Sequence, residues 1–108
     1  MGYVMYIESP KSTDLFPMAY FSAATTVSTV NANTDVSTVT FNLDQRTQAQ
    51  LANTGATGTA MFSANITATT AGATGSFATT SIAANRWLVY RATATGPTGP
   101  SKVWISLY

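Results

Sequence analysis

The sequence predicts an all-β fold, mainly an antiparallel sandwich or a jelly-roll-like barrel, with at most one short helix near residues 44–53. Runs of Thr, Val, Tyr, Phe, Ile and Trp recur along the chain and are separated by Gly, Pro, Asn and Asp, as is typical of strands and turns. Several runs alternate apolar with polar side chains, which indicates strands with one buried face and one wet face. The length fits a single β domain over residues 1–108.

The first forty residues predict four strands. Residues 3–8 (YVMYIE) form the first, and residues 18–24 (MAYFSAA) form the second, after a loop that contains two prolines. Two similar segments follow, TVSTV at 26–30 and DVSTV at 35–39, joined by the Asn-rich sequence NANT at 31–34. Since Asn tolerates the backbone conformations of tight turns, this repeat predicts a β-hairpin.

The second arm of that hairpin continues with a regular alternation. Val39, Phe41 and Leu43 alternate with Thr and Asn, which predicts a buried apolar face and a polar face in contact with water. Residues 44–53 (DQRTQAQLAN) break this rhythm with good helix formers. Asn42 or Asp44 can cap the start of a helix there and Gly55 can close its end, so we expect one short helix lying flat on the body.

The tetrapeptide GATG occurs at 55–58 and again at 72–75. We interpret each copy as a turn that leads into a strand, because two copies are fewer than a solenoid repeat needs. Residues 60–69 have the length of such a strand. Their apolar side chains alternate along one face, which consists of Phe62, Ala64, Ile66 and Ala68.

The C-terminal third predicts a second hairpin, in which residues 86–95 and 103–108 flank the breaker sequence GPTGPSK. The last strand is apolar on both faces, and so is the first. Strands that are apolar on both faces are covered on both faces, and a 108-residue chain can cover few strands twice. We therefore expect a partner subunit to supply the cover through an oligomer interface formed by Tyr3, Tyr6, Trp104 and Tyr108.

Composition excludes several classes of function. Charged residues make up only 8% of the chain, and the net charge is +1 from scattered basic residues, so no basic cluster is present to bind nucleic acid. Histidine and cysteine are absent, which removes the common nucleophile, the common general base and the usual zinc ligands. The four carboxylates lie on separate segments, and no stretch has the length of a membrane span. We expect no enzyme activity, cofactor, metal or membrane partner.

The aromatic residues of the C-terminal third allow two interpretations. Trp87 and Tyr90 are a possible ligand platform on which sugar rings stack, alone or together with Trp104 and Tyr108. Packing in a core or an interface explains the same rings, and the polar side chains that sugar sites use are sparse around them. We favour packing and keep the ligand platform as the alternative.

In composition and size the chain resembles the small Ala/Thr-rich β proteins of tailed-bacteriophage virions, particularly capsid decoration (cement) proteins. The resemblance rests on the low charge, the GATG-type turns, the TVSTV-type strands and the absence of His and Cys. It implies a non-enzymatic protein that forms dimers or trimers with itself, binds the major capsid protein and stabilises the shell from outside. It also implies synthesis in the host cytoplasm and a final place on the capsid surface. The alternative is a glycan-binding or adhesion module of a fibre or cell surface.

Overall fold

The computed structural model describes residues 2–11, 14–52, 58–96, 99 and 102–108. Within these residues the protein consists of ten strands and one short helix, so the all-β prediction is confirmed. The strands are β1 (Tyr3–Glu8), β2 (Leu15–Phe21), β3 (Thr25–Thr26), β4 (Val30–Thr34), β5 (Val39–Arg46), β6 (Thr59–Ala60), β7 (Ile66–Ala68), β8 (Ser81–Ile82), β9 (Arg86–Thr95) and β10 (Lys102–Leu107), and the helix is α1 (Gln48–Ala52).

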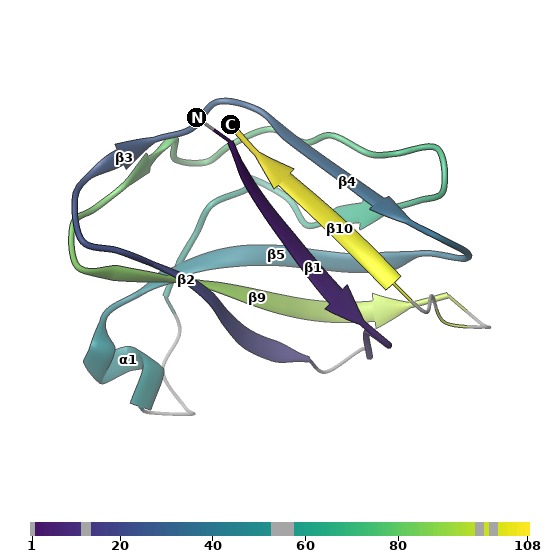
Figure 1. The fold of residues 1–108 in the computed structure, drawn as a ribbon, viewed down its shortest axis with the longest axis horizontal. Coiled ribbons are helices and arrows are strands. Elements are labelled where there is room, and N and C mark those ends of the chain that lie inside the picture. The colour runs from purple at the N-terminus through teal and green to yellow at the C-terminus, as the bar shows by residue number, and fades with distance from the viewer. Residues whose placement is uncertain (1, 12–13, 53–57, 97–98, 100–101) are drawn as a thin grey trace.

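The strands form two stacked antiparallel sheets and one small strand pair. A three-stranded sheet has the order β1-β10-β4, and a five-stranded sheet has the order β2-β9-β5-β6, with β7 also paired to β5. In Figure 1 the three-stranded sheet lies in front, and its strands cross those of the five-stranded sheet obliquely. The strands β3 and β8 pair with each other at one end. The two main sheets stack along the shortest dimension of the molecule, which measures 37 × 30 × 21 Å.

Both sheets turn their apolar faces toward one shared core. Val39, Phe41 and Leu43 of β5 are fully buried there, as the alternation predicts. The three-stranded sheet contributes alternate residues of β10 from the opposite side, which are Val103, Ile105 and Leu107. The alternation expected in the first and last strands is therefore observed on the core side of both.

The helix is present, but it starts at Gln48 and not at residue 44. Asp44 and Arg46 still belong to β5, where they pair with β9. Thr47 caps the helix instead of Asn42 or Asp44. The Gln50 N–H donates to Thr47 Oγ1 at 3.1 Å, and the Thr47 N–H donates to Gln50 Oε1 at 2.8 Å. This is a capping box, and it fixes the helix start after the strand has ended. Gly55, the expected end of the helix, lies outside the described residues.

Neither predicted hairpin forms. The expected turn at 31–34 is strand β4, which pairs with β10, while β5 belongs to the other sheet. The chain turns instead at residues 35–38, where Ser37 has a φ of 59°. Strands β9 and β10 are likewise central strands of different sheets. A sandwich needs connections between its layers. The connections from β4 to β5 and from β9 to β10 therefore join strands of different sheets and not neighbours in one sheet.

Two further strand predictions need correction. The second strand covers Leu15–Phe21 and not residues 18–24. The strand expected over 60–69 is divided into β6 and β7, because the Asn42 side chain captures the backbone of Phe62. Of the first GATG only Gly58 is described. The second includes Ala73, which pairs with Ala32, and it is followed by an isolated pairing of Phe77 with Phe62 instead of a strand.

The sandwich is covered on one side and open on the other. The edge of β4 that faces away from β10 is hydrogen-bonded to residues 69–73. Ala32 and Ala73 exchange two backbone hydrogen bonds of 2.8 Å, and the Thr34 N–H donates to Thr69 O at 3.0 Å. On the opposite side, β1 and β2 are the last strands of their sheets. Within the described ranges, neither of them pairs with a further strand. The candidate interaction surface lies on the three-stranded sheet, next to this open side.

Candidate interaction surface

The outer face of the three-stranded sheet carries exposed apolar side chains. The odd-numbered residues of β1 and β10 enter the core, so the even-numbered ones face outward. Tyr6 lies opposite Trp104 in the register, and their ring centroids are 5.8 Å apart. Val4 and Tyr6 are 70% and 42% exposed, Tyr108 is 53% exposed, and Trp104 is half-buried. We call Val4, Tyr6, Trp104 and Tyr108 the outer aromatic face.

Tyr108 extends this face past the end of β10. Its backbone is held by Thr29, which accepts from the Tyr108 N–H at 2.9 Å and donates to the Tyr108 carbonyl at 3.1 Å. Its ring lies over Gly2, where a Cβ would come within 2.9 Å of a ring carbon. The two ends of the chain therefore meet at one end of the outer aromatic face, as Figure 1 shows.

Three of the four predicted interface residues share this face, and the fourth does not. Tyr3 is an odd-numbered residue that points inward, and its ring packs edge-on against Phe21 of β2 at a centroid distance of 5.1 Å. That contact joins the two sheets at the open side. Val4 faces outward instead of Tyr3, because side chains alternate between the two faces of β1.

The surface has little charge. Glu8 lies opposite Lys102 in the register, at the end of β1 away from Gly2. The Tyr6 hydroxyl donates to Glu8 Oε1 at 3.4 Å, and loss of water around the ring together with the nearby Glu8 carboxylate raises the pKa of Tyr6. The phenol therefore stays neutral at physiological pH. This surface therefore offers no strong electrostatic attraction to a partner that carries a high positive or negative charge.

The possible ligand platform of Trp87 and Tyr90 does not form as one surface. The two residues are three positions apart on β9, so they lie on opposite faces of the five-stranded sheet. Tyr90 is fully buried between Phe41 and Phe16, with centroid distances of 5.7 and 6.3 Å. Its hydroxyl has no hydrogen-bond partner among the described residues, and burial raises the pKa of Tyr90 far above its ordinary value.

Trp87 pairs instead with Tyr20, a residue of β2 that is not among the predicted platform residues. Their ring centroids are 5.2 Å apart on the outer face of the five-stranded sheet. The indole N–H of Trp87 donates to Gln48 Oε1 at 2.9 Å, and the Tyr20 hydroxyl donates to Asn85 Oδ1 at 3.0 Å. The sequence gives no direct signal for this pair, because it depends on the pairing of β2 with β9.

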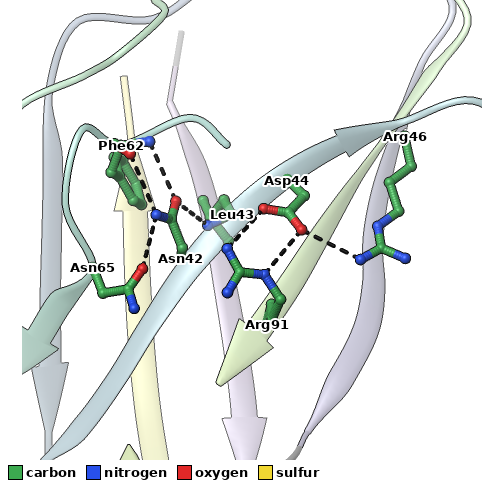
Figure 2. Close-up of polar contacts among 7 residues, drawn as sticks. All are labelled: Asn42, Leu43, Asp44, Arg46, Phe62, Asn65 and Arg91. Carbon is green, nitrogen blue, oxygen red and sulfur yellow. Dashed lines mark hydrogen bonds and ion pairs between the residues drawn. The ribbon is translucent and has the colours of Figure 1, made fainter. Parts of the chain in front are cut away.

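A buried charged cluster lies on the same outer face, beside this pair. Figure 2 shows the Asp44 carboxylate between two guanidinium groups. Arg46 Nη2 donates to Asp44 Oδ2 at 3.3 Å, while Arg91 donates through Nε at 3.0 Å and through Nη2 to Oδ1 at 3.2 Å. Asp44 and Arg46 are only 2% and 3% exposed. A Cβ at Gly58 would meet Arg46 Cγ at 2.7 Å, so the chain there lies directly against that side chain.

Asn42 extends this polar layer by fixing the segment that follows β6. Its Oδ1 accepts from the N–H groups of Leu43 and Phe62, and its Nδ2 donates to Phe62 O and to Asn65 Oδ1 (Figure 2). The expectation that Asn42 lies on a wet face is therefore wrong: the residue is 3% exposed. The cluster cross-links β5 and β9, and both oxygens of its one carboxylate accept hydrogen bonds from arginine side chains.

The edge strand β2 presents a second apolar region. Leu15, Phe16 and Tyr20 are 40–48% exposed along it. A hollow of about 280 Å³ lies at its end, lined by Tyr3, residues 19–23 and Thr25, none of them charged. Among the residues that the structure describes, no group of three or more acidic, His or Cys side chains is placed to hold a metal.

The chain matches no protein-family model, no curated protein and no solved structure. No helix among the described residues is long and apolar enough to cross a membrane.

Proposed function

We propose that the chain is a non-enzymatic structural subunit of a virus particle, of the capsid decoration (cement) type, that associates with itself and binds the outer surface of the shell. The observation that carries the proposal is the outer aromatic face. It places Tyr6, Trp104 and Tyr108 outside a core that is already complete between the two sheets.

Such a role needs surfaces and no active site. Full burial of a large apolar side chain stabilises an assembly by roughly 1.5–3 kcal/mol, and each half-exposed ring offers about half of that. Multiplied over the many copies on a shell, this free energy favours the assembled particle over its separate parts. The low charge of the chain fits the same role, because weak repulsion lets copies pack side by side.

A glycan-binding or adhesion module remains the second candidate, and the pair Tyr20–Trp87 favours it. The two adjoining rings are flanked by two amide side chains. The Tyr20 hydroxyl donates to the amide oxygen of Asn85, and the indole N–H of Trp87 donates to the amide oxygen of Gln48. The amide N–H₂ groups are then oriented to donate to sugar hydroxyls. Glycan-array binding that is lost in Trp87→Ala and kept in Trp104→Ser would favour this candidate.

Co-sedimentation with shells of the virus that encodes the chain tests the first proposal. The protein should pellet with the shells at a fixed ratio, and the double variant Trp104→Ser/Tyr108→Ser should stay in the supernatant. Val36→Ser is the matched control, because Val36 is 49% exposed but lies in the turn after β4, outside the outer aromatic face. Equal pelleting of all three proteins would contradict the assignment of this face.

A further inference from the structure

The edges of the two main sheets differ in how well they are protected from pairing with another chain. An unpaired edge strand is a template for a further strand, and proteins normally block it with proline, bulges, charges or a covering segment. The edge of β4 is covered by residues 69–73. The edge of β2 contains Pro17, which has no N–H to donate, and a bulge between Pro17 and Ala19.

Strand β1 has no proline and no bulge, and no other described segment covers its outer edge. It pairs with β10 without interruption over six residues and carries a single charge at its last position, Glu8. Val4, near its middle, is 70% exposed. A regular, apolar and uncovered edge beside protected ones indicates an edge that another strand occupies in the working protein.

We propose that β1 pairs in antiparallel fashion with β1 of a second copy, so that the two three-stranded sheets become one continuous six-stranded sheet. This deepens the proposed function and rests on its self-association. Inward residues must face inward residues of the partner, which restricts the possible registers. The register centred on Met5 places Val4 opposite the partner's Tyr6 and Tyr3 opposite the partner's Ile7, so every pair between residues 3 and 7 is apolar or aromatic.

Other registers of the same symmetry fit less well. Centring the pair on Tyr6 places the carboxylate of Glu8 opposite the partner's Val4, and centring it on Val4 leaves Ile7 without a partner residue in the strand. In the Met5-centred register, Glu8 lies beyond the paired segment and keeps its own cross-strand neighbour, Lys102.

Charge and area both point to a second copy as the occupant. The strand between residues 3 and 7 is neutral and the whole chain carries a net charge of +1, so two copies meet almost without repulsion. The two-fold axis also brings the β2 sides of the copies toward each other. Tyr6, Phe16 and Tyr20 are 42%, 40% and 48% exposed, which at roughly 200 Å² per aromatic side chain leaves about 260 Å² of ring surface per copy.

Val4 and Leu15 raise that apolar area to on the order of 400 Å² per copy. Interfaces are about 60% apolar, so the open side corresponds to an interface of about 700 Å² per partner. A standard stable interface buries about 800 Å² per partner. The joined sheet would also place the two outer aromatic faces side by side, as one larger surface toward a shell.

The absence of cysteine makes this arrangement directly measurable, because single cysteines can carry spin labels. Val4, Glu8 and Asn31 are exposed, and all three lie on the outer face. With a strand spacing of about 4.8 Å and a rise of about 3.4 Å, the Met5-centred register predicts separations between equivalent Cα atoms of about 8, 20 and 25 Å, respectively. Electron paramagnetic resonance of Val4→Cys, Glu8→Cys and Asn31→Cys should give distances in that order.

A charge placed on the edge provides a second test. Val4→Lys brings two ammonium groups close together in the dimer and should weaken self-association at least tenfold, as measured by sedimentation equilibrium. Asn31→Lys adds the same charge to the same face on β4 and should leave the association constant unchanged. Both positions are exposed, so both variants should fold.

The outcomes separate this inference from the function that it rests on. An assembly larger than two copies, or an Asn31 distance shorter than the Glu8 distance, would overturn the β1 pairing and leave self-association standing. A single-copy species at every concentration would overturn both the pairing and the self-association. Binding to shells is measured independently by co-sedimentation.

Discussion

Replacing Asp44 with asparagine should destabilise the protein strongly, because this side chain is the counter-ion of the buried Arg46 and of the partly exposed Arg91. The change keeps the shape of the side chain and removes its charge. Arg46 is 3% exposed, and its Nε has no hydrogen-bond partner in the part of the chain that the structure describes, so it would become a buried charge without a counter-ion there. Removing one partner of a buried ion pair costs about 3–5 kcal/mol. Arg91 is 33% exposed and reaches water, so it adds little, and we expect about 3 kcal/mol in total.

Thermal and urea unfolding followed by circular dichroism measure this effect. For a domain of this size, a loss of about 3 kcal/mol lowers Tm by roughly 10–20 °C. Glu8→Gln is the matched control, since Glu8 is an exposed carboxylate and its loss should change stability by less than about 0.5 kcal/mol.

A triple variant distinguishes an unpaired charge from a lost contact. Asp44→Leu/Arg46→Met/Arg91→Met removes all the charges at once and should recover most of the stability, because apolar replacement of a whole buried cluster is often neutral. If the free energy of unfolding of Asp44→Asn lies within about 0.5 kcal/mol of that of the parent chain, the cluster does not stabilise the fold, and the reasoning from its burial is refuted.

Three further predictions concern single buried or capping side chains. Tyr90→Phe should be neutral or stabilising by about 1 kcal/mol, because it removes a buried hydroxyl without a partner. Since burial raises the pKa of Tyr90 in the folded state, the parent chain should lose stability as the pH rises above about 10, and denaturant titrations should show the Tyr90→Phe variant losing less. Asn42→Ala should cost about 2–3 kcal/mol, because it leaves the buried backbone of Phe62 unbonded, and equal urea midpoints would contradict this. Thr47→Ala should cost about 1 kcal/mol through loss of the cap, with faster amide exchange confined to α1.

The core and the outer aromatic face could be predicted from the sequence because both follow a period of two. Val103, Ile105 and Leu107 enter the core, and Trp104 and Tyr108 face outward, as the alternation requires. The same rule explains the misplacement of Tyr3, whose odd number assigns it to the inner face.

The strand pairing could not be read in the same way, because it depends on contacts between distant segments. The Asn-rich sequence at 31–34 has turn propensity, but it completes a sheet beside β10, and Ala32 and Thr34 are buried there. Asp44, as a possible helix cap, and the helix formers that follow it obscured the continuing alternation of β5. That alternation, together with Asn42, is the one signal that could have placed the buried cluster on a single face.

Sedimentation equilibrium of the parent chain beside Val4→Lys tests the claim that a sister copy covers the exposed apolar side chains at the β1 edge. The parent should show a concentration-dependent mass approaching twice the 11.3 kDa of one chain, and Val4→Lys should form markedly less of that species while keeping its circular dichroism spectrum. A parent chain that stays at 11.3 kDa at every concentration would show that these side chains face water in the isolated protein and would contradict the claim.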